Sequence, residues 1–419
     1  MADSGKKRYA LAVIGGGASG LLAAAAAAEE ADRAGLPVDI TVYEANPRVG
    51  KKILVTGNGR CNLTNESMGP EYYRGAVSLF GAVYRQFDRE ATLSFFEKAG
   101  LFTRSDFAGR VYPMSNQASS VLDALRGVCA ERGVQEKTSC KIVSLQKQGN
   151  GFLLNGTYYA DRAILATGGR AAPVHGSDGS GYELLRPFGV TVTPLFPALT
   201  PLTIKEFTKA LKGVRAAGGI TLKSAGRTLA QATGEIQYTD YGLSGIPAMQ
   251  VSRFAAQRLA GGGEVLAFVD SAPDIPAEEL TDKLLTVRKD HPAMTAETML
   301  SGLMPKRLGT VLIASCSLSP VKEIGGLHEN ALAKIAGAVK RTKYTVASVR
   351  GFADAQVTAG GVAETEIDGA AMELKKVRGL YVCGELVDVD GDCGGYNLQW
   401  AFSGGAAAGK NAVRSLTGR

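Results

Sequence analysis

A glycine-rich stretch, residues 15–20 with the sequence GGGASG, carries a spacing that binds phosphate in nucleotide-binding proteins. It follows an apolar run, residues 9–14, and precedes an alanine-rich run, residues 21–28. In the pattern G-x-G-x-x-G, the first glycine permits a tight turn, the second lets the backbone approach a pyrophosphate, and the third lets a helix pack on a strand. The phosphates then lie at the helix N-terminus, where free N–H groups and the helix dipole favour negative charge. The stretch therefore predicts a strand, a phosphate-binding turn and a helix.

An acidic residue follows at the spacing that this kind of site requires. A second apolar run, residues 38–43, ends at Glu44, which lies 24 residues after Gly20. In dinucleotide-binding proteins, a carboxylate at this point accepts hydrogen bonds from a ribose. We expect the same role for Glu44.

The C-terminal part of the chain has a second combination of strand, glycines and helix. Residues 380–385, LYVCGE, predict a strand that runs into Gly384 and Glu385, and the glycine-rich residues 391–396 precede a helix expected to open at Asn397. Flavin enzymes place a second helix N-terminus at the edge of the ring that becomes negative on reduction. Because an NAD-dependent dehydrogenase does not need this second element, the pair favours FAD as the cofactor.

Length and composition restrict the class of protein. A chain of 419 residues exceeds what one hydrophobic core usually supports, so two or three structural units are expected. The net charge is +7, but no basic stripe interleaved with aromatic residues occurs, which argues against nucleic acid as a partner. No uninterrupted apolar run reaches about 18 residues, so we expect no membrane-spanning helix and no membrane partner. The six cysteines lack both C-x-x-C pairs and zinc-ligand spacing, which predicts no metal site and a reducing, cytoplasmic location.

The residues between the two glycine-rich regions indicate the elements that position them. Amphipathic patterns predict helices over 83–99 and 118–132, the second ending at Gly133. Alternating patterns predict strands over 138–146 and 151–160. Another apolar run, residues 162–167, predicts a buried strand that ends at Gly168 and Gly169.

The residue composition and the hydrophobic pattern of the sequence change after Gly189. Prolines and β-branched residues dominate first, and a helical pattern with several prolines follows. We therefore predict a β-rich unit, with a helical subdomain inside it, inserted into the nucleotide-binding domain. The predicted boundaries are 1–190 and 351–419 for the FAD-binding domain, 191–273 and 341–350 for the β-rich domain, and 274–340 for the helical subdomain.

Together these motifs resemble the HI0933-like, or BaiN-like, family of FAD-dependent flavoproteins, whose members are also labelled aminoacetone oxidases. The most specific motif is GKKILVTGNGRCNLTN at residues 50–65. The resemblance implies an α/β fold, with a Rossmann-type FAD-binding domain of the glutathione-reductase-like two-dinucleotide class, an inserted β-barrel and a small helical domain. The other motifs follow in the family's order at residues 15–20, 166–169, 234–245, 360–362 and 384–399.

The resemblance also implies FAD contacts at matching positions of this chain, from the pyrophosphate through the ribose to the flavin. Many relatives carry Phe-Thr-His-x-Gly where residues 238–242 read YTDYG, so the role of that histidine is in doubt here. The expected contact residues are Gly15, Gly17, Ala18, Ser19, Gly20, Glu44, Ala45, Lys51, Lys52, Gly57, Asn58, Gly59, Arg60, Cys61, Asn62, Ile142, Thr167, Gly168, Gly384, Glu385, Gly394, Gly395, Tyr396, Asn397 and Leu398.

The sequence singles out no catalytic residue. His175 is a candidate proton donor or a turn residue, and Arg60 either positions the flavin or binds an acidic substrate. Tyr396 either donates a proton or packs as an aromatic ring. Cys61 and Cys393 both lie in cofactor loops, but no surrounding motif lowers a thiol pKa, so packing against the flavin is favoured over a redox pair.

The predicted function is that of an FAD-dependent oxidoreductase that exchanges hydride with a small organic substrate. The resemblance to BaiN-type reductases indicates a conjugated carbon–carbon double bond in a bile-acid or steroid-like enone. Because the chain has one dinucleotide fingerprint, NAD(P)H would act only as a transient electron donor. The alternatives are an amine or aminoketone oxidase that uses O₂, and a flavin-bearing accessory or scaffold protein in RNA modification. The physiological substrate and the oligomeric state are not specified by the sequence.

Overall fold

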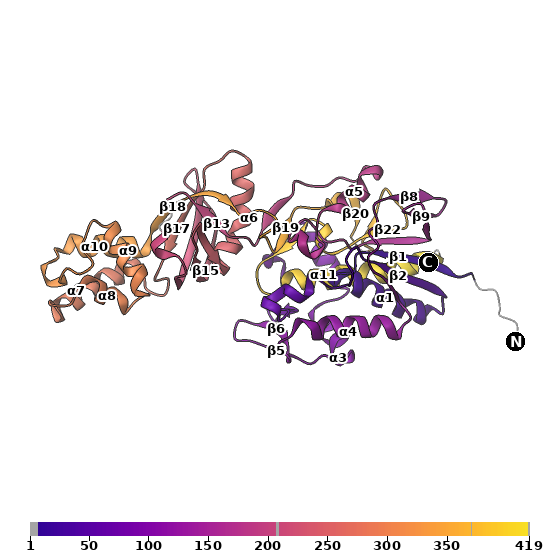
Figure 1. The fold of residues 1–419 in the computed structure, drawn as a ribbon, viewed down its shortest axis with the longest axis horizontal. Coiled ribbons are helices and arrows are strands. Elements are labelled where there is room, and N and C mark those ends of the chain that lie inside the picture. Colours follow the sequence, from indigo (N-terminus) through magenta and orange to yellow (C-terminus); the bar gives the residue numbers. More distant parts are fainter. Residues whose placement is uncertain (1–6, 207–208, 370, 418–419) are drawn as a thin grey trace. The chain divides into compact units, whose positions relative to one another are not determined.

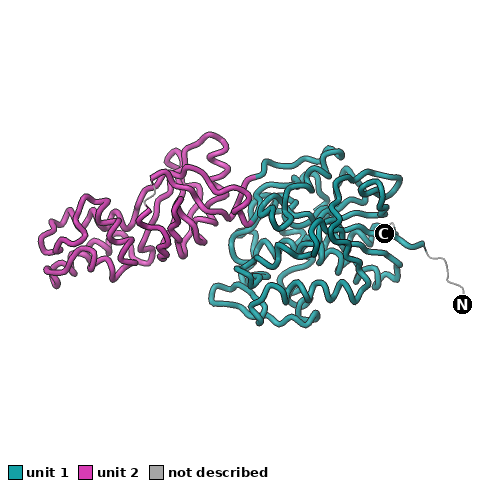
Figure 2. Tube along the Cα trace, in the orientation of Figure 1, with its two compact units in different colours: residues 1–195, 357–419 teal, residues 196–356 magenta. Residues whose placement is uncertain are grey.

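The computed structural model describes residues 7–206, 209–369 and 371–417. The chain divides into two compact units, Met1–Leu195 with Val357–Arg419, and Phe196–Gln356 (Figure 2). These divisions fall a few residues from the boundaries expected after residues 190 and 350. Both glycine-rich regions that suggested a cofactor site belong to the first unit.

A seven-stranded sheet forms the centre of the first unit, in the order β20-β21-β22-β11-β1-β2-β7 (Figure 1). Five of its strands are parallel, and β20 and β21 form an antiparallel edge. The inner strands are apolar and buried, as expected of parallel strands with both faces covered. The bounds are β1 (Tyr9–Ile14), β2 (Val38–Tyr43), β7 (Gln135–Lys137), β11 (Arg162–Leu165), β20 (Ile367–Asp368), β21 (Glu373–Leu374) and β22 (Leu380–Val382).

Two long helices, α1 (Ala18–Ala34) and α11 (Tyr396–Arg414), pack against each other in this unit. Their contact is unusually close: a Cβ added at Gly409 of α11 would lie 2.1 Å from the carbonyl oxygen of Ala23 of α1. Only glycine permits that approach. Six consecutive alanines of α1, residues 23–28, are all buried.

Smaller sheets and helices complete the first unit. Two three-stranded antiparallel sheets have the orders β10-β9-β8 and β3-β6-β5, and β23 pairs with β4. The bounds are β3 (Thr64–Asn65), β4 (Tyr73–Gly75), β5 (Thr103–Ser105), β6 (Arg110–Pro113), β8 (Leu145–Gln148), β9 (Gly151–Leu154), β10 (Tyr158–Ala160), β19 (Val357–Ala359), β23 (Val389–Gly391), α2 (Val77–Tyr84), α3 (Arg89–Lys98), α4 (Ala118–Glu131) and α5 (Ser180–Leu185).

The structure confirms the predicted helix at 118–132 as α4, but three other predictions were wrong. The strand expected over 151–160 is divided into β9 and β10 by a turn at residues 155–157. The helix expected over 83–99 is split into α2 and α3, because the Asp88 carboxylate accepts a hydrogen bond from the Ala91 N–H at 2.8 Å and so starts a new helix. The strand expected over 138–146 begins only at Leu145. Residues before it bond instead to the end of β2, where the Cys140 N–H donates to the Glu44 carbonyl at 2.8 Å.

The second unit contains a closed barrel of six strands, in the order β13-β16-β15-β14-β17-β18. One helix, α6 (Ile246–Ala260), follows β16, and four more lie between β17 and β18 in the chain. Apolar residues from the barrel and these helices form one continuous core. The remaining bounds are β12 (Phe196–Ala198), β13 (Leu202–Ile204), β14 (Arg215–Ser224), β15 (Arg227–Tyr238), β16 (Gly242–Gly245), β17 (Leu266–Asp270), β18 (Thr342–Val349), α7 (Ala277–Asp290), α8 (Ala296–Ser301), α9 (Lys306–Ser315) and α10 (Glu329–Lys340).

Two further properties concern the described residues alone. None of their helices has both the length and the apolar character needed to cross a membrane. Their His, Cys, Asp and Glu side chains form no cluster of three or more that could hold a metal ion.

Candidate cofactor-binding site

The turn between β1 and α1 has the shape of a phosphate cradle. A Cβ at Gly20 would lie 1.9 Å from the Gly15 carbonyl oxygen, so the turn can close only with glycine there. Gly17 is the N-cap residue of α1, no side chain caps the helix, and its first turn has no acidic residue. A Cβ at Gly17 would meet no described atom within 4 Å. The first N–H groups of α1, which include those of Ala18 and Ser19, are therefore available to an anion.

Glu44 supports this turn from the end of β2. Its buried carboxylate accepts the Gly16 N–H at 2.9 Å, and it accepts both the backbone and side-chain N–H groups of Asn46 at 2.7 Å. Each carboxylate oxygen has more than one acceptor site, so Glu44 can also accept a ribose hydroxyl. Asn46 was not predicted, although its place just after the acidic residue is the kind of signal that could have identified it.

The turn that contains His175 lies beside Glu44. A Cβ at Gly176 would lie 2.6 Å from Asn46 Nδ2, and one at Gly168 would lie 2.7 Å from Ser177 Oγ. His175 Nδ1 and Ser177 Oγ are buried and have no hydrogen-bond partner within the described part of the chain. Buried polar atoms normally have partners, so two such atoms together are suited to a polar ligand such as a nucleoside. This location associates His175 with the ribose end of the site.

Three other expected contact residues lie near this end. Ile142 is buried and follows Cys140, which is hydrogen-bonded to the backbone of Glu44. Thr167 lies two residues after the end of β11. Its Oγ1 lies against Gly181, where a Cβ would be 1.9 Å away. Ala45 lies between Glu44 and Asn46 in the turn after β2.

The loop after residue 50 is tied to the phosphate cradle. The Gly50 N–H donates to the Gly16 carbonyl at 2.7 Å. Further along, Gly57, Asn58, Gly59 and Cys61 all have positive φ values, of 56°, 56°, 80° and 58°. The short 3-10 helix over Ile53–Gly59 is kinked at residues 56–58, and the loop then turns through Cys61, whose N–H donates to the Thr56 carbonyl at 3.0 Å.

The side chains of this loop have different surroundings. Cys61 is fully buried, and burial raises the pKa of its thiol to about 12, as it does for Cys393. Both thiols thus keep their protons at neutral pH, which favours packing over redox chemistry. Asn62 Oδ1 is buried and has no partner among the described residues. The Arg60 guanidinium is exposed and stacks 4.7 Å over the Tyr112 ring.

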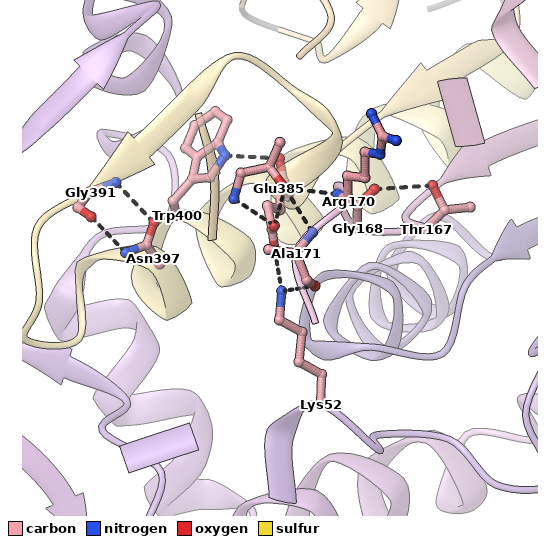
Figure 3. Close-up of polar contacts among 11 residues, drawn as sticks. Lys52, Thr167, Gly168, Arg170, Ala171, Glu385, Gly391, Asn397 and Trp400 are labelled. Atoms are coloured by element: carbon pink, nitrogen blue, oxygen red, sulfur yellow. Dashed lines mark hydrogen bonds and ion pairs between the residues drawn. The ribbon is translucent and has the colours of Figure 1, made fainter. Parts of the chain in front are cut away.

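A polar network joins this loop to the C-terminal half of the unit (Figure 3). Lys52 Nζ forms an ion pair with Glu385 at 2.6 Å and also donates to the Ala171 carbonyl at 3.2 Å. The other Glu385 oxygen accepts hydrogen bonds from the backbone N–H and the hydroxyl of Thr358, both at 2.9 Å. Thr358 was not predicted, because a threonine two residues before a pair of glycines carries no distinctive pattern. Lys51, the neighbour of Lys52, forms no part of this network in the described structure.

The N-terminus of α11 is built by a second glycine loop. Asn397 bonds to both backbone groups of Gly391, at 2.9 Å and 2.8 Å, and Trp400 Nε1 donates to the Gly384 carbonyl at 3.0 Å (Figure 3). Asn65 Nδ2 donates to the Gly394 carbonyl at 2.9 Å. The N-cap residue is Gly395, and no side chain caps the helix.

Tyr396 and Leu398 lie in the first turn of α11. The Tyr396 ring is buried and stacks on Tyr72, with ring centroids 4.6 Å apart. Burial, with smaller contributions from Tyr72 and Asp392, raises the pKa of the Tyr396 phenol. These contacts favour the packing role for this ring. Leu398 packs, partly buried, against the core of the unit.

The two helices place both N-termini on the same side. Ser19 of α1 lies against Gly405 of α11, Ala23 lies against Gly409, and Glu30 bonds to Arg414 at 2.8 Å, so the helices run in the same direction. Because α11 begins nine residues before Gly405 and α1 begins one residue before Ser19, the N-terminus of α11 extends about 12 Å past the start of α1. One extended dinucleotide can therefore have its pyrophosphate at α1 and its flavin at α11. The described residues fit FAD.

The residue that departs from the expected family motif belongs to the second unit. Asp240 is exposed and forms an ion pair with Lys212 at 3.0 Å. The hydrogen bond from Lys212 lowers the pKa of the Asp240 carboxyl. This side chain is an ordinary surface carboxylate of the barrel.

Comparisons with known proteins extend the geometric evidence. The family model described as the HI0933-like protein Rossmann domain matches residues 9–411. A Clostridium scindens protein named 3-dehydro-bile acid delta(4,6)-reductase is 40% identical over 91% of this chain and 95% of its own length. An Escherichia coli protein named ribosomal RNA dihydrouridine synthase is 28% identical over 89% of this chain and 92% of its own. Among solved structures, a 3-ketosteroid delta1-dehydrogenase from Sterolibacterium denitrificans covers 97% of this chain and all of its own, at 14% identity and a TM-score of 0.49.

Proposed function

The chain belongs to the HI0933-like family, and we propose that this FAD-dependent oxidoreductase reduces a carbon–carbon double bond conjugated to a carbonyl group. The names of two relatives share this chemistry. A delta(4,6)-reductase of a 3-dehydro bile acid saturates double bonds conjugated to a ketone, and dihydrouridine is uridine whose 5,6 double bond, conjugated to a carbonyl, has been reduced. The two names therefore describe the same type of reduction on substrates of very different size.

The observation that carries the proposal concerns α1 and α11. These helices run in the same direction, neither N-terminus is capped by a described side chain, and the two N-termini are offset along the helix axis. The first turn of α1 would hold the pyrophosphate, Glu44 the ribose, and the first turn of α11 the ring edge that becomes negative. When bound, FAD supplies the hydride-transfer chemistry that the side chains lack. The network of Lys52, Glu385 and Thr358 would fix the segments on either side of the cofactor.

For the substrate, we propose a bile-acid-like or steroid-like enone. The C. scindens relative is 40% identical to this chain, against 28% for the E. coli relative. We also propose NAD(P)H as the transient electron donor. A reducing cytoplasm remains our proposal for the location, supported by six cysteines that form no disulfide.

Uridine in RNA is the second candidate substrate. Two relatives, from E. coli and Haemophilus influenzae, are named ribosomal RNA dihydrouridine synthases. In addition, residues 196–356 contain 19 lysines and arginines against 14 aspartates and glutamates, so the positive excess lies mostly in the second unit. A basic surface is a usual requirement for RNA binding.

An anaerobic assay separates these candidates and the oxidase alternative. The holoprotein is titrated with NADH and NADPH while the flavin absorbance is followed, and is then mixed with a 3-oxo-4,6-diene steroid, a uridine-containing RNA, or air. We expect bleaching by a nicotinamide, reoxidation by the steroid, and a product that has gained two hydrogen atoms by mass spectrometry. Reoxidation by RNA alone would select the second candidate. Reduction by an amine or aminoketone, with rapid reoxidation only by air, would instead identify an oxidase.

A further inference from the structure

The hairpin formed by β5 and β6 belongs to the first unit (Figure 1). One of its faces combines exposed apolar side chains with arginines. Arg104 is the cross-strand partner of Tyr112, and the Met114 N–H donates to the Phe102 carbonyl at 2.9 Å. Cross-strand partners and residues two apart share a face of a sheet, so Phe102, Arg104, Tyr112 and Met114 all project from the same side. Phe102 is 62% exposed and Met114 is 60% exposed. Exposed apolar groups of this size in one place indicate a binding surface.

Arg60 adds a second guanidinium to this face. It stacks over the Tyr112 ring, and its Nε donates a hydrogen bond to the Gly57 carbonyl at 3.3 Å. Neither Arg60 nor Arg104 has a carboxylate partner within residues 7–206, 209–369 and 371–417. Arg110, by contrast, is paired with Asp106 at 2.8 Å. Two guanidiniums without a counterion beside one aromatic ring form a site for an anion.

This face adjoins the end of the site where the flavin is expected. A Cβ at Gly57 would lie 3.4 Å from the Tyr112 ring, so the face borders the loop of residues 57–61. Arg110, on the same face, is the cross-strand partner of Asn65 in β3. Asn65 Nδ2 in turn donates to the Gly394 carbonyl, in the loop before α11. The hairpin therefore connects both loops that surround the flavin end.

We propose that this face binds the substrate as an amphipathic anion, with an apolar ring system on Phe102 and Met114 and a carboxylate on Arg60 and Arg104. The proposal rests on the proposed function, and it specifies which part of the substrate the protein recognises. Arg104 is a binding residue distant in sequence from every motif, and it touches the anionic group rather than the reacting double bond. A planar guanidinium can donate hydrogen bonds to both carboxylate oxygens, which gives the ring system a fixed orientation.

The test compares a 3-oxo-4,6-diene bile acid, which has a free carboxylate, with its methyl ester. For the wild-type holoenzyme we expect a KM at least about tenfold lower for the acid than for the ester. Arg104→Ala should reduce this preference for the acid about tenfold, and Arg104→Lys should restore part of it. The matched control is Arg132→Ala, which removes an exposed arginine paired with Asp32 at the C-terminal end of α1. The control should keep the wild-type preference.

The outcomes distinguish this inference from the proposed function. If both substrates are reduced with equal KM, or if Arg104→Ala raises the two KM values equally, the anion site is wrong and the reductase assignment stands. If neither substrate is reduced, binding is followed through the flavin spectrum. Binding of the acid that depends on Arg104 would then support the surface while the reductase assignment fails, and binding independent of Arg104 would overturn both. Competition by a short uridine-containing RNA, lost in Arg104→Ala, would assign the face to RNA and overturn the proposal.

Discussion

Thr358 joins three segments that are far apart in the sequence. Its buried hydroxyl oxygen accepts the N–H groups of Arg170 and Ala171, at 2.7 Å and 3.0 Å, and its hydroxyl hydrogen goes to Glu385 at 2.9 Å. Glu385 in turn holds Lys52. One small side chain thus connects the loop that follows β11, the loop after residue 50 and the segment before α11.

Replacing Thr358 by valine keeps the shape of the side chain and removes its hydrogen bonds. Two N–H groups then lose their acceptor, and that of Ala171 is buried, so we expect a loss of about 3 kcal/mol in the free energy of unfolding and weaker FAD binding. Thr358→Ser keeps the hydroxyl and should remain within about 1 kcal/mol of the wild type. Urea denaturation of both variants, with flavin fluorescence for the FAD Kd, provides the measurement. Equal stability of Thr358→Val and the wild type would show that the network is dispensable.

At the scale of elements, the contact between α1 and α11 determines how far apart the two helix N-termini lie. At Gly409, which has no side chain, the backbone of α11 lies directly against the backbone of α1 at Ala23. Any side chain there must separate the helices, and the separation would move the first turn of α11 relative to that of α1. The geometry that fits an extended dinucleotide depends on this contact.

Two glycine-to-alanine substitutions in helices should therefore have opposite effects. Gly409→Ala places a Cβ 2.1 Å from the Ala23 carbonyl oxygen, and we expect it to lower the free energy of unfolding by about 1–3 kcal/mol and to weaken FAD binding. Gly127→Ala, at an exposed position of α4 with no neighbouring atom within 4 Å, should raise stability by about 0.5–1 kcal/mol through helix propensity. Thermal and urea denaturation measure both. If Gly409→Ala were also stabilising, the close contact would be disproved.

The elements show which features of the fold follow from local sequence. The phosphate turn, α4 and the helix at the C-terminal glycine loop were predicted because apolar periodicity and glycine spacing are local signals. The break between α2 and α3 was missed because one capping residue, Asp88, outweighed a continuous amphipathic pattern. The missing strand before Leu145 reflects backbone bonds to Glu44 and Asn46, which lie almost 100 residues earlier.

In the candidate cofactor site, too, only the residues of local motifs could be predicted from the sequence. Gly15–Gly20 and Glu44 are recognisable from spacing, whereas Thr358 and Ser177 acquire their positions only from tertiary contacts. Arg104 is likewise placed opposite Tyr112, on which Arg60 stacks, only by the register of β5 on β6. Sequence spacing identifies residues that bind through the backbone of one turn. It does not identify residues that meet across strands or between distant segments.

At the scale of the whole molecule, the chain has two separate hydrophobic cores. The core of the first unit is built on the seven-stranded sheet and α11, and that of the second unit on the barrel and α7–α10. The two sets of buried residues have no member in common. All expected FAD contacts lie in the first unit.

These two cores should unfold in separate transitions, and FAD should stabilise only one of them. A ligand at a hundred times its Kd adds about 2.7 kcal/mol to the state that binds it, so FAD should raise the melting temperature of the first unit alone. Leu312→Ala, in the core of the second unit, should cost about 2–5 kcal/mol and lower only the other transition, whereas Leu165→Ala should lower the FAD-dependent one. Differential scanning calorimetry with and without FAD checks both assignments. A single transition that shifts with FAD and with Leu312→Ala alike would mean that the two cores unfold as one cooperative body.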